Sequence, residues 1–501
     1  MIIAQPATTE AYRLLHEGAL AFSVIEAAGM RIDVGYLDRT IIETEQRIAA
    51  IEAKLKGMDE YNLQRRRYGT ETNLTSRDQL AAVLFEDMGL PCEKRTKTGR
   101  PQLDEEALLK TGLSYCRGLL KLEKLNKLNG TYLHGLRREV EADGYVHTSY
   151  NLASGAYNDD TKGGARSYRG SCSDPNLQNV PVRNKEIGKL IRQAFIPRDG
   201  HVLVEADFGG HEVRVACNVC KDPVLIHDAV EGDMHRDWAA KCWGIEEDEV
   251  TKDIRFYGKN GFVFPQFYGD FHKQIAPILW EQRGLETKGG RNLEDHLNMA
   301  MGITELGDCS FGQDAVQGTF EHQIKQVEHE FWNDRYVGYR DWRKMRLRQY
   351  KSQGWFDMPT GFVCSGVYAK NQVLNYPIQG AAFHCLLWTV IQLVKEMRRK
   401  KMRSVVIGEV HDSVVADVHR SELDDYVEMI ERIAVKDIME AWSWITVPLV
   451  IEADVAENNW WNKVPYQKQV AEPVCMACGG TGRNSKGGTC FPCQRRKELK
   501  K

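Results

Sequence analysis

Two apolar segments that lie far apart in the chain each end in an aspartate, and this pair constrains the fold more than any other feature. Residues 201–207 have the pattern of a buried strand with Asp207 at its end. Residues 405–415 form two apolar half-strands around a polar tip, which predicts a hairpin that exposes Asp412. Aspartates on adjacent strand ends would bring hard oxygen ligands together, as a pair of Mg²⁺ ions about 3.5–4 Å apart requires. The pattern therefore favours phosphoryl or nucleotidyl transfer, with the alternative that each aspartate only caps a turn.

Three further carboxylates lie near these strand ends. They are Glu205, Glu409 and Asp417. Each either supports metal binding by the aspartate pair or is simply exposed to solvent. The spacing does not distinguish among the three.

The order of apolar patterns along the chain predicts an open α+β core with a helical insertion. The expected helices cover residues 12–28, 37–55, 79–88, 116–140 and much of 237–348, and the later strands cover 404–410, 413–418 and 447–455. A chain of 501 residues with 42% hydrophobic and 27% charged residues is typical of a globular protein, with about two to four domains.

The sequence shows neither a signal peptide nor a membrane-spanning segment. The first residues lack a basic region followed by an apolar core. The longest apolar stretch, residues 381–394, is shorter than the roughly 20 residues that a bilayer requires. We therefore expect a soluble cytoplasmic protein that does not bind membranes.

The total charge of the chain disfavours nucleic-acid binding, but the distribution of charge along the chain does not. The net charge of −3 is far from the strongly basic balance of many nucleic-acid-binding domains. Residues 94–138, however, contain eleven basic and four acidic side chains. This local excess predicts a surface that follows phosphates, with a solvated helix face as the alternative.

A basic helix in the middle of the chain has the composition of a nucleotide site. Arg255 and Lys259 are four residues apart, so they share one helix face and are able to bind a polyphosphate together. His235 lies upstream. The aromatic residues that follow are Phe262, Phe264, Phe267 and Tyr268. Cations beside aromatic rings suit a nucleotide, although a surface cation pair above core aromatics gives the same pattern.

Four of the thirteen cysteines form two Cys-x2-Cys pairs near the C-terminus. They are Cys475, Cys478, Cys490 and Cys493. The spacing predicts a zinc ribbon that holds one structural Zn²⁺, because each pair supplies two ligands of a tetrahedral ion. Most of the other cysteines lie in apolar surroundings and are expected to be reduced core thiols.

The motifs resemble those of the family A (DNA polymerase I-like) DNA polymerases, in the family's order from about Leu20 to Trp460. The segments similar to the family are the thumb-like 73–80 and 144–148, the motif A region 169–183, 191–195 and 207–214, the fingers motif B at 233–236 and 255–269, and the later palm motifs at 375–380 and 410–412. This resemblance implies a right-hand fold of palm, fingers and thumb. The implied domains are an N-terminal lead segment at 1–40, the thumb at 41–165, the first part of the palm at 166–235, the fingers at 236–370, the second part of the palm at 371–465 and the zinc ribbon at 471–501.

The resemblance also implies a role for each motif residue. Asp207 and Asp412, with the Phe208 carbonyl, would bind two catalytic Mg²⁺ ions. Lys259 would donate a proton to pyrophosphate. The implied nucleotide-binding residues are His235, Arg255, Lys259, Phe264, Tyr268 and Glu212, and those for primer–template DNA are Arg169, Asn375, Gln379 and His411. Glu212 would crowd the sugar 2′ position and so exclude ribonucleotides.

Three positions depart from the family pattern. Gly209 and Gly210 replace the usual Ser-Gln, and Ser413 replaces a Glu, which removes an accessory carboxylate. The spacing from Lys259 to Tyr268 is one residue longer than usual. This extra residue leaves open whether Phe262 or Phe264 stacks on the nucleotide, with a slight preference for Phe264, and a π-bulge near Gly261 would reconcile the two.

The predicted function is template-directed addition of dNTPs to a primer 3′ end in DNA replication, by a monomer of bacteriophage type. Because the resemblance begins near Met1, no intrinsic 3′–5′ exonuclease is expected. The zinc ribbon is basic, so it is expected to contact DNA or replication accessory proteins. If the protein is viral, it would act in the host cytoplasm. The alternatives are a polymerase that uses ribonucleotides or an RNA template, and a catalytically weak or silent DNA-binding replication scaffold.

Overall fold

The computed structural model describes residues 3–92, 95–96, 99–152, 167–182 and 184–468. The chain divides into two compact units, Met1–Val464 and Pro465–Lys501.

A twisted antiparallel sheet lies at the centre of the first unit, with strand order β12-β11-β6-β10-β9. Its strands are β6 (His201–Phe208), β9 (Val405–Val410), β10 (Ser413–His419), β11 (Ile451–Ala456) and β12 (Val464–Pro465). β6 pairs with β10 on one side and with β11 on the other. The predicted hairpin and its partner strand are therefore confirmed, and they are neighbours in one sheet.

The last predicted strand is shorter than expected. Residues 447–450 were expected to be extended and paired, but β11 begins at Ile451. The backbone of Val447 is instead bound by the side chain of Asn218, whose Oδ1 accepts from Val447 N and whose Nδ2 donates to Val447 O. A segment whose backbone groups are satisfied by a side chain does not need a strand partner.

Long helices pack next to the sheet. α1 (Thr9–Ala28) contacts both α18 (Lys370–Lys400) and β9, and α18 also contacts α9 (His211–Cys220). By length and composition α18 alone among the described helices is able to cross a membrane, but 78% of its most apolar window is buried inside the protein. It therefore has the surroundings of a core helix, although the helix is longer than the apolar stretch that the sequence marks.

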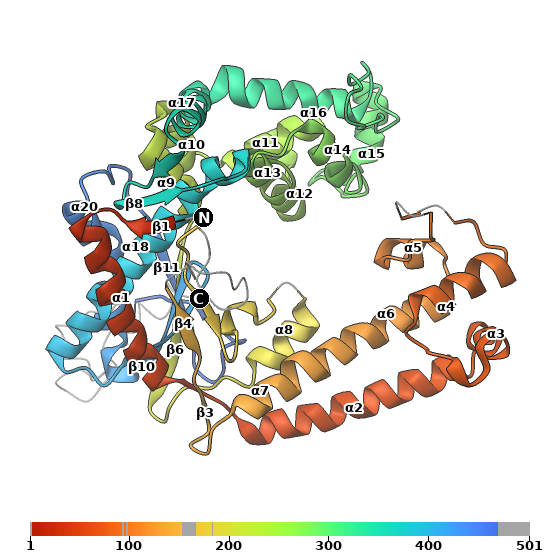
Figure 1. Ribbon diagram of the computed structural model, residues 1–501, viewed down its shortest axis with the longest axis horizontal. Helices are drawn as coiled ribbons and strands as arrows, with labels where there is room; N and C mark the ends of the chain where they lie inside the picture. Colours follow the sequence, from red (N-terminus) through yellow and green to blue (C-terminus); the bar gives the residue numbers. More distant parts are fainter. Residues whose placement is uncertain (1–2, 93–94, 97–98, 153–166, 183, 469–501) are drawn as a thin grey trace, which may run out of the picture. The chain divides into compact units, whose positions relative to one another are not determined.

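A pair of long helices forms an arm (Figure 1). α2 (Val34–Lys56) runs beside α6 (Ser114–Lys127), which continues through a π-helical segment, η3 (Leu128–Leu133), into α7 (His134–Glu139). The helices predicted at 37–55 and 116–140 are thus confirmed. The other elements of this part of the chain are β1 (Ile3–Pro6), β2 (Met30–Arg31), α3 (Asp59–Tyr68), η1 (Gly69–Glu71), α4 (Arg77–Ala81), η2 (Ala82–Asp87), α5 (Glu105–Lys110), β3 (Tyr145–Val146), β4 (Ser149–Asn151), β5 (Ser171–Ser173), η4 (Leu177–Asn179) and α8 (Lys185–Arg192).

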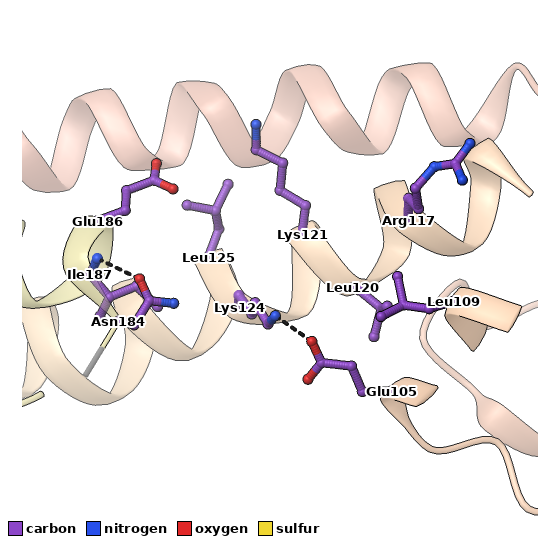
Figure 2. Close-up of a pocket in the computed structure, with 10 residues that line it drawn as sticks. All are labelled: Glu105, Leu109, Arg117, Leu120, Lys121, Lys124, Leu125, Asn184, Glu186 and Ile187. Carbon is purple, nitrogen blue, oxygen red and sulfur yellow. Dashed lines mark hydrogen bonds and ion pairs between the residues drawn. The ribbon is translucent and has the colours of Figure 1, made fainter. Parts of the chain in front are cut away.

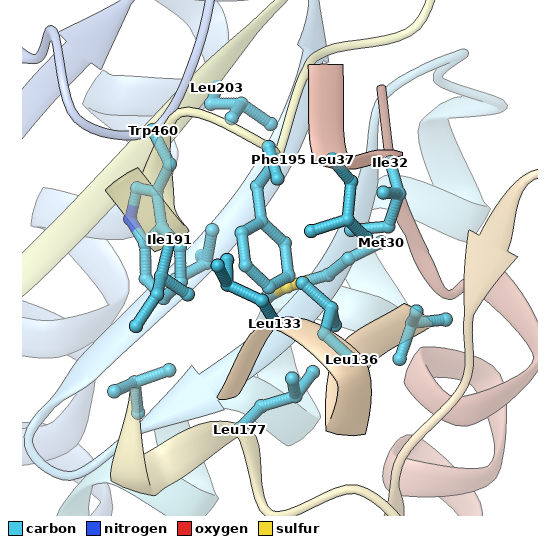
Figure 3. Packing of buried hydrophobic residues seen from close by; sticks show 14 of the residues in the cluster. Met30, Ile32, Leu37, Leu133, Leu136, Leu177, Ile191, Phe195, Leu203 and Trp460 are labelled. Carbon is cyan, nitrogen blue, oxygen red and sulfur yellow. The ribbon is translucent and has the colours of Figure 1, made fainter. Parts of the chain in front are cut away.

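One apolar cluster joins the base of the arm to the sheet (Figure 3). Its residues come from α2, α7, α8 and β6, and the Phe195 ring packs edge-on against Trp460 at 5.3 Å between ring centroids. A second cluster, which includes Leu55, Leu84 and Tyr115, fills the other end of the helix pair. The arm therefore has its own apolar core, and its base packs against the sheet.

The region between the two halves of the sheet is mainly helical, as predicted. It contains α10 (Pro223–Val230), α11 (Met234–Trp243), η5 (Glu247–Glu249), α12 (Lys252–Tyr257), η6 (Gly258–Val263), α13 (Phe264–Tyr268), α14 (His272–Trp280), α15 (Leu293–His296), η7 (Leu297–Met301), α16 (Phe320–His329), η8 (Glu330–Arg335), α17 (Val337–Gln353), β7 (Trp355–Asp357) and β8 (Phe362–Ser365). Later helices are η9 (Arg420–Glu422), α19 (Leu423–Glu431), η10 (Arg432–Asp437) and α20 (Ile438–Ala441).

A π-helical turn interrupts the basic helix at the position that the spacing indicated. η6 covers Gly258–Val263, and the backbone N–H of Phe264 donates to the carbonyl of Lys259, five residues earlier. Pro265 follows, and it has no N–H to donate to Gly261 as an α-helix requires. The predicted π-bulge is confirmed.

Candidate active site

The two predicted aspartates lie side by side. In the register of β6 with β10, Asp207 is opposite Ser413, the residue after Asp412. The backbone N–H of Phe208 donates to the carbonyl of Asp412 at 3.1 Å, which fixes the end of β6 to the hairpin turn. The fold thus brings together two carboxylates that are distant in sequence.

The electrostatics of this pair favour a bound cation. Burial raises the pKa of Asp207 to about 6, with further contributions from the charges of Asp412 and Glu205. Burial acts in the same direction on Asp412, but His211 and Arg169 outweigh it and hold its pKa below the ordinary value. Because two close carboxylates disfavour each other's charge, a divalent cation between them would stabilise both. These residues therefore fit the Mg²⁺ ions that the sequence predicts.

A network of side chains surrounds the pair. Arg169 lies 3.6 Å from Glu212 and 3.9 Å from Asp412, so it stands between the two carboxylates. The Tyr268 hydroxyl donates to Glu212 at 2.9 Å. Asn375 on α18 donates its amide to the Tyr268 carbonyl at 3.0 Å. These contacts connect the sheet, the basic helix and α18 at one place.

The other predicted DNA contacts lie close by. Gln379 follows Asn375 by one turn of α18, and so the two share a helix face. His411 occupies the hairpin turn with a φ of 61°, a left-handed conformation that is uncommon for a residue with a side chain. Its side chain is exposed beside Asp412.

Sequence reasoning missed His211 as a site residue. Its side chain is buried, stacks on Phe208 at 4.3 Å, and has Nδ1 3.8 Å from Asp412. Neither ring nitrogen has a hydrogen-bond partner among the described residues. The contact crosses from α9 to the hairpin, and no local pattern in the sequence signals it.

A cavity of about 380 Å³ opens at the start of α9, and its lining begins two residues after Asp207. Its lining includes Gly209 and Gly210 at the start of α9, together with His235, Arg255 and Lys259. The N-terminus of a helix and the cations of Arg255 and Lys259 suit a polyphosphate. Asp228, Asp233 and Glu452 line the same cavity. The absence of side chains at the two glycines leaves this wall of the cavity as bare backbone.

The surroundings of the basic residues in the cavity lower the pKa of two of them and fix the orientation of the third. Burial, followed by the charges of Lys259 and Arg255, lowers the pKa of His235 to about 4. Burial and Arg255 also lower the pKa of Lys259. Arg255 donates through Nε to both oxygens of Asp233, at 3.0 and 2.8 Å, which fixes its guanidinium. A lysine whose pKa is lowered gives up its proton more readily.

The structure separates the two candidate phenylalanines. Phe262 is fully buried and packs on Trp238 and Phe331. Phe264 is partly exposed, stacks parallel to Tyr268 at 5.9 Å, and has the Lys259 ammonium 5.2 Å from its ring centre. The π-helical turn therefore places Phe264, rather than Phe262, on the Lys259 face.

The three additional carboxylates near the strand ends have different partners. Asp417 binds Arg198 at 3.1 Å, away from the aspartate pair. Glu409 accepts from Gln178 at 2.7 Å, and burial raises its pKa to about 8. Glu205 lies on the same face of β6 as Asp207, as its spacing of two residues requires.

The basic segment of the arm lines a groove of about 340 Å³ between α6 and α8 (Figure 2). Arg117, Lys121 and Lys124 line it, but so do Glu105 and Glu186. Lys124 is paired with Glu105 at 2.5 Å. The positive excess that the sequence indicates is thus partly neutralised within the arm itself.

The four cysteines predicted to bind zinc, at positions 475, 478, 490 and 493, lie outside the described residues. Of the cysteines expected in the core, Cys116, Cys242 and Cys385 are buried free thiols, whereas Cys92 is only half-buried.

Comparison with known proteins gives the family. The model of DNA polymerase family A matches residues 37–462. The chain belongs to this family. It is 28% identical to DNA polymerase I of Lactococcus lactis subsp. cremoris over 447 residues, 31% identical to DNA polymerase I of Streptococcus pneumoniae serotype 4 over 400 residues, and 29% identical to the thermostable DNA polymerase I of Thermus aquaticus over 448 residues.

These matches cover 87%, 78% and 87% of this chain but only 44%, 40% and 46% of the three relatives, so the chain spans less than half of their length. Among solved structures, the POL domain of Pol1 from M. smegmatis, in complex with DNA primer-template and dNTP, is similar with a TM-score of 0.67. It is 24% identical, and the match covers 89% of this chain and 70% of that one. The α+β fold with its antiparallel sheet is therefore that of a family A polymerase domain.

Proposed function

We propose that this chain is a template-directed DNA polymerase that adds dNTPs to the 3′ end of a primer. The observation that carries the proposal is the position of Asp207 and Asp412, which lie at neighbouring ends of two central strands, close to the cavity that Arg255 and Lys259 line. A carboxylate pair next to a polyphosphate-binding cavity suits nucleotidyl transfer. Family membership and the relatives named above support the same reaction.

Each residue of the site would have its own role in the reaction. Asp207, Asp412 and the Phe208 carbonyl would hold two Mg²⁺ ions, which when bound supply Lewis acidity at the primer hydroxyl and the triphosphate. Arg255 and His235 would bind the phosphates. Lys259 Nζ would donate a proton to the leaving pyrophosphate, which its lowered pKa favours.

Other side chains would orient the substrates. Phe264 would stack on the base of the incoming nucleotide, and the Tyr268 ring parallel to it would lie near the templating base. The hydrogen bond from Tyr268 orients Glu212, which would stand beside the sugar 2′ position. Arg169, Asn375, Gln379 and His411 would contact the primer–template duplex, which they would read by shape.

We further propose the right-hand division of the chain. The sheet would be the palm, assembled from residues 166–235 and 371–465. The helical region, residues 236–370, would be the fingers, and the arm, within residues 41–165, would be the thumb. In this assignment the basic side chains of the arm would contact the DNA backbone.

Primer extension tests the proposed function. Purified protein, Mg²⁺ and a single dNTP are added to primers on four templates that differ only in the first unpaired base. We expect extension only by the complementary nucleotide, and a strong preference for dNTPs over NTPs because Glu212 blocks the 2′-hydroxyl. Lack of extension with all four dNTPs, by protein that binds the primer–template, would instead favour a silent DNA-binding scaffold.

Two finer proposals concern what the 501 residues contain. We propose that they have no 3′–5′ exonuclease activity, which Mg²⁺-dependent shortening of a labelled primer by the pure protein would refute. We also propose that Cys475, Cys478, Cys490 and Cys493 hold one structural Zn²⁺ in a basic ribbon that contacts DNA or an accessory protein. Their spacing supports this second proposal.

A further inference from the structure

Position 413 holds a short side chain at the place where the resemblance to family A leads one to expect a glutamate. Ser413 is opposite Asp207 in the sheet register, and cross-strand partners lie on the same face. Its side chain is buried, and its hydroxyl lies 3.0 Å from the Val410 carbonyl. At this end of the hairpin, Asp412 is therefore the carboxylate beside Asp207, and position 413 adds none.

The neighbouring strand brings a carboxylate to the same place. Glu205 precedes Asp207 by two residues, so both side chains project from one face of β6. In the antiparallel register Glu205 is diagonal to Ser413, and its Oε1 lies 3.4 Å from the Ser413 hydroxyl. A glutamate at position 413 and the present Glu205 would therefore compete for the same space.

Contacts to its other carboxylate oxygen, Oε2, hold the Glu205 side chain in this position. Oε2 accepts from Trp460 Nε1 at 2.7 Å and from Lys463 Nζ at 3.0 Å. Arg192 lies 3.7 Å away and stacks on the Trp460 ring at 3.9 Å. The side chain is only 12% exposed, so its orientation is fixed. Both donors contact Oε2, which leaves Oε1 directed toward Ser413 and the aspartate strand end.

We propose that Glu205 supplies from β6 the accessory carboxylate that Ser413 does not supply from β10. This inference rests on the metal-binding aspartate pair of the proposed function. Glu205 is a positioning residue: it adds negative charge beside Asp207 and so strengthens the attraction of the pair for divalent cations. Of the three carboxylates that the sequence left undecided, Glu205 is the one with an oxygen, Oε1, directed toward Ser413 and the aspartate strand end.

The test is Mn²⁺ binding to the free protein, followed by electron paramagnetic resonance, without DNA or nucleotide. Glu205→Gln keeps an acceptor for Trp460 but removes the charge, and we expect affinity for Mn²⁺ to fall roughly tenfold, as is typical for loss of a supporting carboxylate. Asp454→Asn is the matched control, because Asp454 also binds Lys463, at 2.9 Å, but from β11. We expect it to change the affinity by less than about twofold.

A double variant that moves the carboxylate from position 205 to position 413 makes the test stricter. Adding Ser413→Glu to Glu205→Gln should restore most of the Mn²⁺ affinity, whereas Ser413→Glu alone should lower the melting temperature, because two carboxylates then share one space. The proposal is overturned if Glu205→Gln binds Mn²⁺ as the wild type does while Asp207→Asn does not. It is equally overturned if Ser413→Glu alone changes neither affinity nor melting temperature.

Failure of this inference can be distinguished from failure of the proposed function. Mn²⁺ binding requires no catalysis, so a protein that binds Mn²⁺ in this pattern but extends no primer would disprove the polymerase proposal and leave the role of Glu205 intact. Conversely, an active polymerase in which Glu205→Gln changes nothing would retain its proposed function and lose this inference.

Discussion

Phe262 and Phe264 are two residues apart but have different surroundings. Phe262 fills the core against Trp238, whereas Phe264 lies beside Lys259 and Tyr268. We expect Phe264→Ala to raise the KM for dNTPs roughly tenfold, as loss of base stacking does, without changing the melting temperature. Phe262→Ala should instead lower the free energy of unfolding by about 3–5 kcal/mol. Steady-state kinetics and thermal melts on both variants check this, and the reverse pattern would assign the stacking role to Phe262.

Glu409 is the buried carboxyl whose pKa is raised to about 8. The native state retains its proton while the unfolded state releases it near the ordinary pKa of 4.5. The unfolded state therefore binds fewer protons between about pH 4.5 and 8, and the contribution of Glu409 to stability falls as the pH rises through this window.

Glu409→Gln should remove this dependence, because the amide stays neutral and is able to accept from Gln178 as the carboxyl does. Relative to the wild type, we expect the variant to gain stability from pH 5 to pH 8, on the order of 3 kcal/mol. Urea unfolding at a series of pH values measures the difference. A constant difference across the window would show that Glu409 is charged in the native state.

Where a motif carries single side chains, the sequence predicted which of them the fold brings together. Asp207, Asp412, Lys259 and Tyr268 all lie around one site, as expected. It did not identify His211 or choose Glu205, because both act through contacts between β6, α9 and the hairpin. Such contacts depend on strand register, which one residue of slip would change and which no local pattern encodes.

The π-helical turn η6 is the element that sets the positions of Lys259 and Phe264 relative to each other, on the side of the site proposed to bind the nucleotide. It accommodates the extra residue between Lys259 and Tyr268 by one wide turn closed by the Phe264 N–H. Asn260 lies in this turn with an exposed side chain that donates to the Phe256 carbonyl. Deletion of Asn260 would convert the wide turn to an α-turn and leave the Lys259 and Phe264 side chains on one face.

We therefore expect deletion of Asn260 to preserve primer extension within about tenfold of the wild-type rate. Insertion of one alanine after Asn260 should abolish it, because each added residue rotates the following helix by about 100°. Single-nucleotide extension rates of the two variants, with circular dichroism to verify folding, make the comparison. Equal loss in both variants would mean that the wide turn itself, and not the alignment of faces, is required.

Elements with strong periodicity were predicted correctly. The helices of the arm, the hairpin β9–β10 and strand β6 all have long, regular apolar patterns. The start of β11 was wrong, because the side chain of Asn218, more than 200 residues away, binds the backbone of Val447. A tertiary hydrogen bond of this kind overrides local propensity and leaves no signal in the segment itself.

At the scale of the whole molecule, the net charge of −3 hides an uneven distribution. Part of the basic excess of the arm is paired internally, as in Lys124 with Glu105. The tail from residue 471 contains seven further basic residues: Arg483, Lys486, Arg495, Arg496, Lys497, Lys500 and Lys501. Nucleic-acid affinity of the complete chain should therefore depend measurably on this tail.

Deletion of residues 471–501 should weaken primer–template binding and reduce the slope of log affinity against log salt by about 1 or more. The deleted protein should also lose its zinc, which we expect at one ion per full-length chain by mass spectrometry of the metal content. Fluorescence anisotropy at several salt concentrations gives the slope. Unchanged affinity at every salt concentration would exclude DNA contact and leave an accessory protein as the partner of the ribbon.

In the proposed reaction, Asp207 and Asp412 together support nucleotidyl transfer. Its most direct measurement is the single-turnover rate of dNTP addition to a primer–template in Mg²⁺, for the wild type and for Asp412→Asn. The substitution keeps the size of the side chain and removes the charge. We predict template-directed addition by the wild type and a loss of roughly a thousandfold or more in the variant, with primer–template affinity unchanged. Addition by Asp412→Asn at a rate close to that of the wild type would show that the Asp207–Asp412 pair does not support the transfer.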